Sequence, residues 1–352
     1  MLPVIVKCLV WDLDNTLWDG TLLEGDDVRL RPGVRETVEA LDARGILHSI
    51  ASRNEHDPAW ERLEELGLAE YFVAPRISFG TKSAAVRAIA DELKFAYGTI
   101  AFVDDRPVER AEVTHHLPDV RCYTHDEVVG LVDRPEFSPP VVTADARRRR
   151  SMYQAAFRRD AVRADFDGPD ESFLQSLDLV LRIVTATDGE IDRVEELTRR
   201  TSQMNATGVP YSDAELRALL DAPDHEVLVT SIDDKFGPYG AVGVLLLEKR
   251  PEVWHLKLLA TSCRVVSLGA GTVILNWLVD RAARAGVHLV ADFRSTARNR
   301  MMDIAYRFAG FTADECACRA RLAPAGDAEI QRLHLMPGPR SAPTTMRLDV
   351  AI

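Results

Sequence analysis

Apolar segments that end in acidic residues alternate with stretches of helical periodicity in the first third of the chain. One apolar segment runs into Trp11-Asp12, and another runs into Asp104-Asp105. The expected strands are 4–10, 46–51, 71–74 and 99–103, and the expected helices are 34–44, 58–66 and 83–93. This alternation predicts a parallel sheet with helices on its faces. In such a fold we expect ligand chemistry at the carboxyl ends of the strands.

A second domain is expected after a proline-bearing, basic segment that reads EFSPPVVTADARRRR. Beyond it, strands and helices alternate again from Leu179, and a glycine-bearing turn, SLGAG, precedes a helix near 272–285. We therefore expect a first domain at 1–135, a basic linker helix within 136–175 and a second α/β domain at 176–352.

Composition excludes several classes of protein. The 352 residues are 46% hydrophobic and 28% charged, which is typical of a soluble globular chain of about two domains. No apolar run is long enough to predict a membrane span, and the early acids argue against a signal peptide, so we expect a cytoplasmic protein. The five cysteines include one Cys-x-Cys pair, Cys316 and Cys318, and their odd number favours free thiols over a disulfide framework.

The negative charge is concentrated in the first domain. The whole chain has a net charge of −12, whereas residues 1–140 hold 15 Lys and Arg against 26 Asp and Glu, a net of −11. An acid excess of this kind argues against nucleic-acid binding through phosphate neutralisation, and we expect no nucleic-acid partner.

Two carboxylates follow the first expected strand. Asp12 is placed to attack phosphorus as a nucleophile, and Asp14 to carry the proton of the leaving group. Asp104 and Asp105 end another strand at the same sheet edge. Carboxylates that converge in this way repel one another unless a cation joins them, and Mg²⁺ with oxygen ligands is the natural choice.

Polar residues at other strand ends and helix starts add to this pattern. Ser52 could donate to a phosphoryl oxygen, and Lys82 could neutralise charge in the transition state. Each residue alone is more often a turn, cap or surface residue. Their order, DxDxT, then Ser, then Lys, then Asp-Asp, resembles the haloacid dehalogenase superfamily of aspartate-nucleophile phosphotransferases.

This resemblance assigns further roles. It implies phosphate contacts for Thr16 and Ser52, and a Mg²⁺ site formed by Asp12, Asp14 and Asp104, with Asp105 nearby. The separations from Asp14 to Ser52 and from there to Lys82 are too short for a large cap domain, so we expect an open site.

The second domain resembles the acyltransferase fold of the GNAT type. In that fold a strand ends beside the acyl carbonyl and a glycine-bearing loop begins the next helix. Cys263 falls at that strand end, near a helix N-terminus and beside Arg264, both of which favour a thiolate. The ordinary alternative is a buried core cysteine.

The combination of domains resembles the FkbH-like glyceryltransferase/phosphatases of polyketide assembly, through DLDNTLW, TSQMN, KFGPYGAVGV and SCRV. The resemblance implies transfer of a glyceryl unit from 1,3-bisphosphoglycerate, through a thioester on Cys263, to a phosphopantetheinylated acyl carrier protein. Acyl or pantetheine contacts are implied for Gln203, Asn205, Arg264 and Gly269. Ser267, Leu268 and Lys257 depart from the family pattern, and these departures leave the acyl unit and its donor open.

Two other functions stay open: a stand-alone Mg²⁺-dependent phosphatase whose second domain only covers the site, and a non-catalytic docking component. An acidic carrier protein is expected to avoid the first domain and to approach the basic residues at 147–150, 158 and 159. The alternative for that run is a solvated linker helix.

Overall fold

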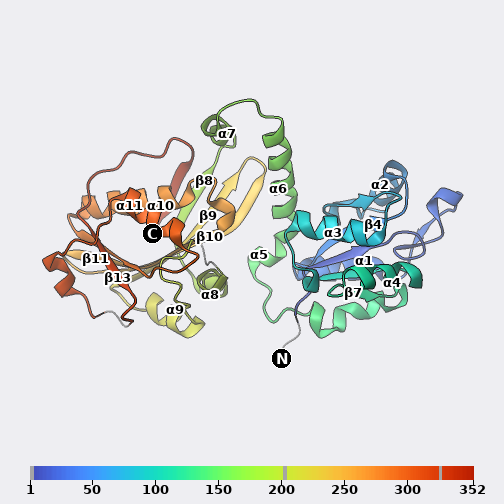
Figure 1. Ribbon diagram of the computed structural model, residues 1–352, viewed down its shortest axis with the longest axis horizontal. Helices are drawn as coiled ribbons and strands as arrows, with labels where there is room; N and C mark the ends of the chain where they lie inside the picture. Colours follow the sequence, from blue (N-terminus) through green and yellow to red (C-terminus); the bar gives the residue numbers. More distant parts are fainter. Residues whose placement is uncertain (1–3, 201–203, 325–326) are drawn as a thin grey trace. The chain divides into compact units, whose positions relative to one another are not determined.

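The chain forms two compact units, Met1–Phe157 and Arg158–Ile352, in the computed structural model (Figure 1). The structure describes residues 4–200, 204–324 and 327–352. The segment expected as a linker, 136–175, is divided between the units, because the boundary falls within α6 (Arg149–Ala164). Among the described residues, no helix combines the length and apolar composition that a membrane crossing requires.

The first unit is built on a five-stranded sheet in the order β5-β4-β1-β6-β7, and every neighbouring pair in it is parallel. Its strands are β1 (Cys8–Trp11), β4 (Leu47–Ser52), β5 (Arg76–Ile77), β6 (Ile100–Val103) and β7 (Arg121–Tyr123). Its helices are α1 (Val34–Ala43), α2 (His56–Glu65), α3 (Lys82–Leu93), α4 (Pro107–His116) and α5 (Ala144–Arg147), and a small hairpin joins β2 (Trp18–Asp19) to β3 (Arg29–Leu30). The predicted parallel sheet is confirmed.

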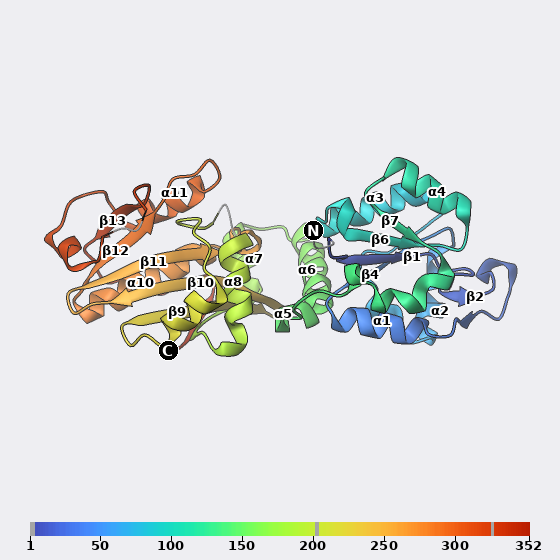
Figure 2. The ribbon, with the colours of Figure 1, turned by 90° about the horizontal axis from the view of Figure 1, so that it is seen from below.

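Helices cover both faces of this sheet. Figure 2 shows α3 and α4 on one face and α1 and α2 on the other. Each face has its own apolar core: Val86, Ile89 and Val113 pack on one side, and Val38 and Leu63 on the other. The strands are therefore apolar on both faces, which explains their nearly continuous hydrophobic sequences.

One expected strand of the first unit is reduced to a single bridge. Of residues 71–74, Tyr71 ends a short 3₁₀ turn, Ala69–Tyr71, Phe72 forms a parallel bridge with His48, and Ala74 has a φ of +49°. A left-handed residue interrupts an extended segment, so the strand of this region begins only at Arg76.

Register brings the strand ends of the first unit together. Trp11 on β1 lies level with Ile50 on β4 and with Val103 on β6. The residues that follow, Asp12 and Asp104, therefore leave neighbouring strands at the same edge of the sheet.

The second unit has a seven-stranded mixed sheet in the order β13-β12-β11-β10-β9-β8-β14. Its strands are β8 (Val180–Thr185), β9 (His225–Asp234), β10 (Gly237–Lys249), β11 (Val253–Thr261), β12 (His288–Phe293), β13 (Gln331–Leu335) and β14 (Arg347–Ala351). Its helices are α7 (Asp170–Ser176), α8 (Ile191–Arg200), α9 (Asp213–Leu220), α10 (Ala270–Ala285) and α11 (Arg300–Ala309). Figure 1 shows α10 and α11 on one face of the sheet and α8 and α9 on the other. The predicted α/β class is thus confirmed for this unit as well.

The two parallel strands β11 and β12 separate toward their carboxyl ends. Their pairing stops at Leu256 and Ala291, although β11 continues to Thr261. The segment 204–206 enters the gap: the amide of Ala206 donates to the Leu259 carbonyl at 3.0 Å, and the amide of Thr261 donates to the Met204 carbonyl at 2.8 Å. Backbone groups that the separation would leave unsatisfied are thereby paired.

The basic run expected as a carrier-docking surface is largely engaged within each unit. Arg150 is half-buried and forms two hydrogen bonds with Asp42, at 3.0 and 3.2 Å. Arg159 is 7% exposed, is paired with Asp234, and its guanidinium lies 3.7 Å from the centroid of the Tyr239 ring. These two charges are paired with carboxylates inside their own units, and carrier docking at the basic run stays a prediction.

Candidate active site

Asp12 and Lys82 form the centre of the first unit's site. Both side chains are buried, and the Lys82 ammonium donates to Asp12 Oδ1 and, at 2.8 Å, to the Ala51 carbonyl. Lys82 is the first residue of α3, whose N-cap Thr81 accepts a hydrogen bond from Ala84. The helix start thus places a buried cation directly against the carboxylate that the sequence predicts as nucleophile.

Two further carboxylates, those of Asp104 and Asp105, lie close to Asp12. Oxygen atoms of Asp12, Asp104 and Asp105 lie within 4.8 Å of one another. The Thr16 hydroxyl donates to Asp12 Oδ2 at 3.3 Å and accepts from the Asp105 amide at 2.9 Å. Thr16 is fully buried, and its hydroxyl joins the residues that follow β1 to those that follow β6.

The carboxylate cluster suits a divalent cation. Asp104 Oδ2 is buried and has no hydrogen-bond partner among the described residues, and Lys82 Nζ lies 3.0 Å from it as an ion-pair partner. Burial, together with the charge of Asp12, raises the pKa of Asp104 to about 6. One ammonium among three carboxylates leaves two negative charges uncompensated, and hard oxygen ligands are those that Mg²⁺ prefers. The residues present therefore fit Mg²⁺.

Asp14 lies apart from this cluster. Its Oδ1 accepts from Trp18 Nε1 at 2.8 Å and from the Leu22 amide at 3.1 Å, and its Oδ2 accepts from Asn54 Nδ2 at 3.1 Å. The group of carboxylates that the structure brings together holds Asp12, Asp104 and Asp105 without Asp14, so it does not group Asp14 with the other expected metal ligands. Burial raises the pKa of Asp14, which favours the protonated form that an acid catalyst needs.

Ser52 and Lys82 line one small pocket of about 210 Å³, together with Ser78, Gly80 and Thr81. Ser52 is the last residue of β4 and is buried. Lys82 lines this pocket and also contacts Asp12, so the pocket lies beside the carboxylate cluster. Asn54, which holds Asp14, was missed in the sequence, although it stands just beyond the same strand end as Ser52.

Cys263 is exposed, which excludes the alternative of a core cysteine. It begins a short 3₁₀ turn, Cys263–Val265, directly after β11, and the N-cap Ser262 accepts from the Arg264 amide at 3.4 Å. Gly269 precedes α10 with a φ of +71°, a conformation that glycine adopts without strain. His255, earlier on β11, is buried, and its Nε2 lies 2.8 Å from Asp292 Oδ1.

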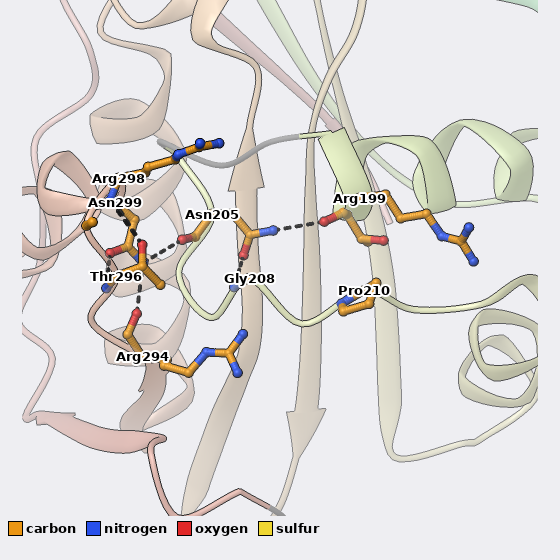
Figure 3. A pocket seen from close by; sticks show the side chains of 10 residues that line it. Arg199, Asn205, Gly208, Pro210, Arg294, Thr296, Arg298 and Asn299 are labelled. Atoms are coloured by element: carbon orange, nitrogen blue, oxygen red, sulfur yellow. Dashed lines mark hydrogen bonds between the residues drawn. The ribbon is translucent and has the colours of Figure 1, made fainter. Parts of the chain in front are cut away.

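A pocket of about 660 Å³ lies at the carboxyl end of β12 (Figure 3). Asn205 lines it and is buried; its Nδ2 donates to the Thr198 carbonyl at 3.0 Å, and its Oδ1 accepts from the Gly208 amide at 2.7 Å. This predicted residue thus shapes the pocket wall. Gln203, predicted with it, lies outside the described residues.

The pocket contains arginines that the sequence analysis missed. Arg199, Arg294 and Arg298 line it, and Asn299 fixes its floor by donating to the Asn205 and Arg294 carbonyls at 3.0 and 2.9 Å. Figure 3 shows the Arg294 side chain reaching toward Gly208. The run FRSTARNR after an apolar strand was the available signal, by the same strand-end reasoning that found Asp104.

Comparison with known proteins bears on the first unit. Residues 21–111 match the family model of the haloacid dehalogenase-like hydrolases. Over 118 residues the chain is 32% identical to human "Magnesium-dependent phosphatase 1", an alignment that covers 28% of this chain and 67% of that protein. The chain belongs to the haloacid dehalogenase-like hydrolases. The matched segment contains Lys82, Asp104 and Asp105 and begins after Asp12 and Asp14.

Solved structures resemble parts of the chain. The N-terminal part of the protein BF1531 from Bacteroides fragilis, containing a phosphatase domain complexed with Mg, aligns with 26% identity and a TM-score of 0.32, covering 36% of this chain and 39% of that one. The ribosomal-protein-S18-alanine N-acetyltransferase from Escherichia coli aligns with 16% identity and a TM-score of 0.33, covering 46% of this chain and 96% of that one. Ard1 from Thermoplasma volcanium has 13% identity and a TM-score of 0.32, with 44% and 95% covered.

Proposed function

We propose that this chain is a bifunctional enzyme. Its first unit removes a phosphate with Mg²⁺, and its second unit transfers a three-carbon hydroxyacyl group, glyceryl from 1,3-bisphosphoglycerate, through Cys263 to the thiol of a phosphopantetheinylated acyl carrier protein. The observation that carries the proposal is the buried contact of Asp12 with Lys82, beside Asp104 and Asp105. The FkbH-like sequence combination supports the acyl unit and the carrier.

In the phosphatase half, an Asp12 oxygen attacks phosphorus, the bond from phosphorus to the substrate oxygen breaks, and Asp14 gives its proton to that oxygen. Asp14 then takes a proton from the water that hydrolyses the aspartyl phosphate. Asp12, Asp104 and Asp105 would hold Mg²⁺, which supplies charge neutralisation when bound. Lys82 holds Asp12 in place, and Ser52 lines the pocket for phosphoryl oxygens.

In the transferase half, the Cys263 thiolate attacks the acyl carbon of the acyl phosphate. The bond from that carbon to the phosphate oxygen breaks, inorganic phosphate leaves, and a thioester remains on Sγ. The carrier thiolate then attacks the same carbon and releases Cys263. Exposure of Cys263 supports access by a macromolecular thiol. Arginines at the carboxyl end of β12 suit the phosphate of the donor.

One observation favours the alternative of a phosphatase without acyl transfer. Cys263 is not among the described residues that line the arginine-bearing pocket. In this second candidate function, the pocket binds an anion unrelated to thioester chemistry.

Intact-mass analysis tests the proposal. The full chain is incubated with 1,3-bisphosphoglycerate, Mg²⁺ and a phosphopantetheinylated carrier, and the masses of both proteins are followed. Wild type and Cys122→Ala, which changes a half-buried thiol of the first unit, should place the acyl group on the carrier, whereas Cys263→Ala should not. Release of phosphate with no acyl adduct on either protein would contradict acyl transfer and support the phosphatase function by itself.

A further inference from the structure

A second group of metal-ligating side chains lies in the second unit, away from the carboxylate cluster. It comprises His288, Cys316, Cys318 and His334, and one donor atom of each lies within 4.8 Å of the others. His288 Nδ1 lies 3.0 Å from His334 Nε2 and 3.4 Å from Cys316 Sγ. Two thiols and two imidazoles converge on one point although up to 46 positions separate them in the chain.

We propose that these four residues bind one structural Zn²⁺ ion. Two cysteines and two histidines are a usual ligand set of tetrahedral zinc, with bonds of about 2.0 Å to nitrogen and about 2.3 Å to sulfur. Tetrahedral angles then place the ligand atoms about 3.3 to 3.8 Å apart. The 3.4 Å from His288 Nδ1 to Cys316 Sγ is close to these values, and the 3.0 Å to His334 Nε2 is about 0.3 Å shorter, so a small shift of the side chains would admit the ion.

Backbone pairing holds the histidines in place. His288 is the first residue of β12. His334 on β13 pairs with Val290 on one side and exchanges hydrogen bonds of 2.7 and 2.8 Å with Thr312 on the other. Both imidazoles therefore project from fixed positions. Folding has already ordered these two residues, so metal binding does not carry the conformational entropy cost of ordering them.

The cysteines lie in a segment with little regular structure. Cys316 is the N-cap of a short 3₁₀ helix, Ala317–Arg321, in the connection between α11 and β13. Cys318 is 8% exposed and packs against Val253, Val290 and Leu322 in a small apolar cluster. Such a small cluster buries little surface, and a metal ion would tie this connection to the sheet.

Position and ligand number both indicate a structural role. All four positions are filled by protein ligands, whereas a catalytic zinc keeps one position open. His288 is at the amino end of β12, and the arginine-bearing pocket lies beyond the carboxyl end of the same six-residue strand. The ion would therefore stabilise the sheet edge without contacting substrate.

Metal analysis of the untagged full chain tests this proposal. After exchange into a buffer with excess Mg²⁺ and a weak chelator, we expect about one zinc per chain in wild type and in the control Cys122→Ser. The double variant Cys316→Ser/Cys318→Ser should lose the zinc. A wild type without zinc, a zinc content unchanged in the double variant, or bound iron in its place would overturn the proposal.

Two further measurements use the wild-type chain, so their outcome does not depend on whether a variant folds. Titration of the thiols with a mercurial should release zinc in step with modification, and substitution by Co²⁺ should give the strong visible bands of a tetrahedral thiolate site. A Cys316–Cys318 disulfide in the freshly purified chain, seen as the loss of two hydrogens in the peptide mass, would contradict the metal site. A cobalt spectrum typical of six oxygen ligands would do the same.

Discussion

Asp12 and Asp14 are two positions apart in the sequence but have different surroundings. Asp12 contacts the buried Lys82 ammonium, whereas Asp14 is held by neutral donors from Trp18, Leu22 and Asn54. Burial raises the pKa of Asp14, which suits a proton carrier, whereas the Lys82 ammonium holds the Asp12 carboxylate in place. The different surroundings of the two carboxylates support the division of roles proposed for them.

Asp14→Asn should separate the two steps of phosphate removal. With p-nitrophenyl phosphate, whose leaving group needs no proton, the variant should release one equivalent of nitrophenolate rapidly and then turn over about 10²–10⁴-fold more slowly, because the attacking water lacks its base. Stopped-flow absorbance measures both phases. Asp19→Asn, at the exposed end of the nearby strand β2, is the matched control. Wild-type steady-state turnover in Asp14→Asn would contradict the role of Asp14.

Helix ends in the first unit depend on glycines in the left-handed conformation. Gly45 follows α1 with a φ of +76°, and Gly67 follows α2 with a φ of +63°. Their surroundings differ, because a Cβ at Gly45 would lie 2.5 Å from the Ala146 carbonyl oxygen, whereas one at Gly67 would meet nothing within 4 Å. The two positions therefore separate backbone strain from a steric clash.

Gly67→Ala should lower the free energy of unfolding by about 1–2 kcal/mol, the usual cost of a left-handed alanine. Gly45→Ala should cost about 1–3 kcal/mol more, because backbone atoms must also move apart. Urea unfolding followed by circular dichroism gives both values. Equal losses in the two variants would show that the contact of Gly45 with the segment at Ala146 is dispensable.

His48 makes the stability of the first unit depend on pH. It is fully buried between Trp11, whose Nε1 donates to Nδ1 at 2.9 Å, and the Val38 carbonyl, 3.0 Å from Nε2. Burial lowers its pKa from 6.5 to about 3. Between these values the unfolded chain binds a proton that the folded chain does not, so stability is present above pH 6.5 and falls as pH decreases.

The His48 contribution should amount to about 2 kcal/mol of lost stability between pH 7 and pH 5. His48→Gln keeps an acceptor and a donor but cannot be protonated, so its unfolding free energy should change about 2 kcal/mol less over this range. His56→Gln, at an exposed histidine, should behave like wild type. An identical pH dependence of His48→Gln and wild type would contradict this linkage.

Elements with local signals could be predicted from the sequence, and those that depend on distant partners could not. The apolar run 99–103 closely matches β6, and the expected helix 34–44 matches α1, because each is delimited by its own residues. The insertion of 204–206 between β11 and β12 has no local pattern. Neither does the approach of Cys316 to His288, since folding alone brings these residues together.

At the scale of the whole molecule, part of the acid excess of residues 1–140 can be assigned to particular contacts. Asp12, Asp104 and Asp105 form the carboxylate cluster, and Asp42 pairs with Arg150. Other acids of the first unit lie on exposed helix faces, as Asp57 and Glu61 do. Because the two units are separately compact, the two proposed chemistries reside in different cores.

Separate cores predict that a change in one unit leaves the chemistry of the other intact. Asp12→Asn should abolish dephosphorylation, while Cys263 still accepts the acyl group from 1,3-bisphosphoglycerate at about the wild-type rate. The acyl group found on the chain or its carrier should then be phosphoglyceryl in the variant and glyceryl in wild type.

Intact-mass spectrometry over a time course distinguishes these adducts, because they differ by one phosphoryl group. Asp19→Asn serves as the control for a lost carboxylate outside the site. A glyceryl adduct formed by Asp12→Asn at the wild-type rate would show that Asp12 is not the nucleophile. Loss of all adducts in Asp12→Asn would instead show that acyl transfer requires an intact first unit, and the independence of the two chemistries would be wrong.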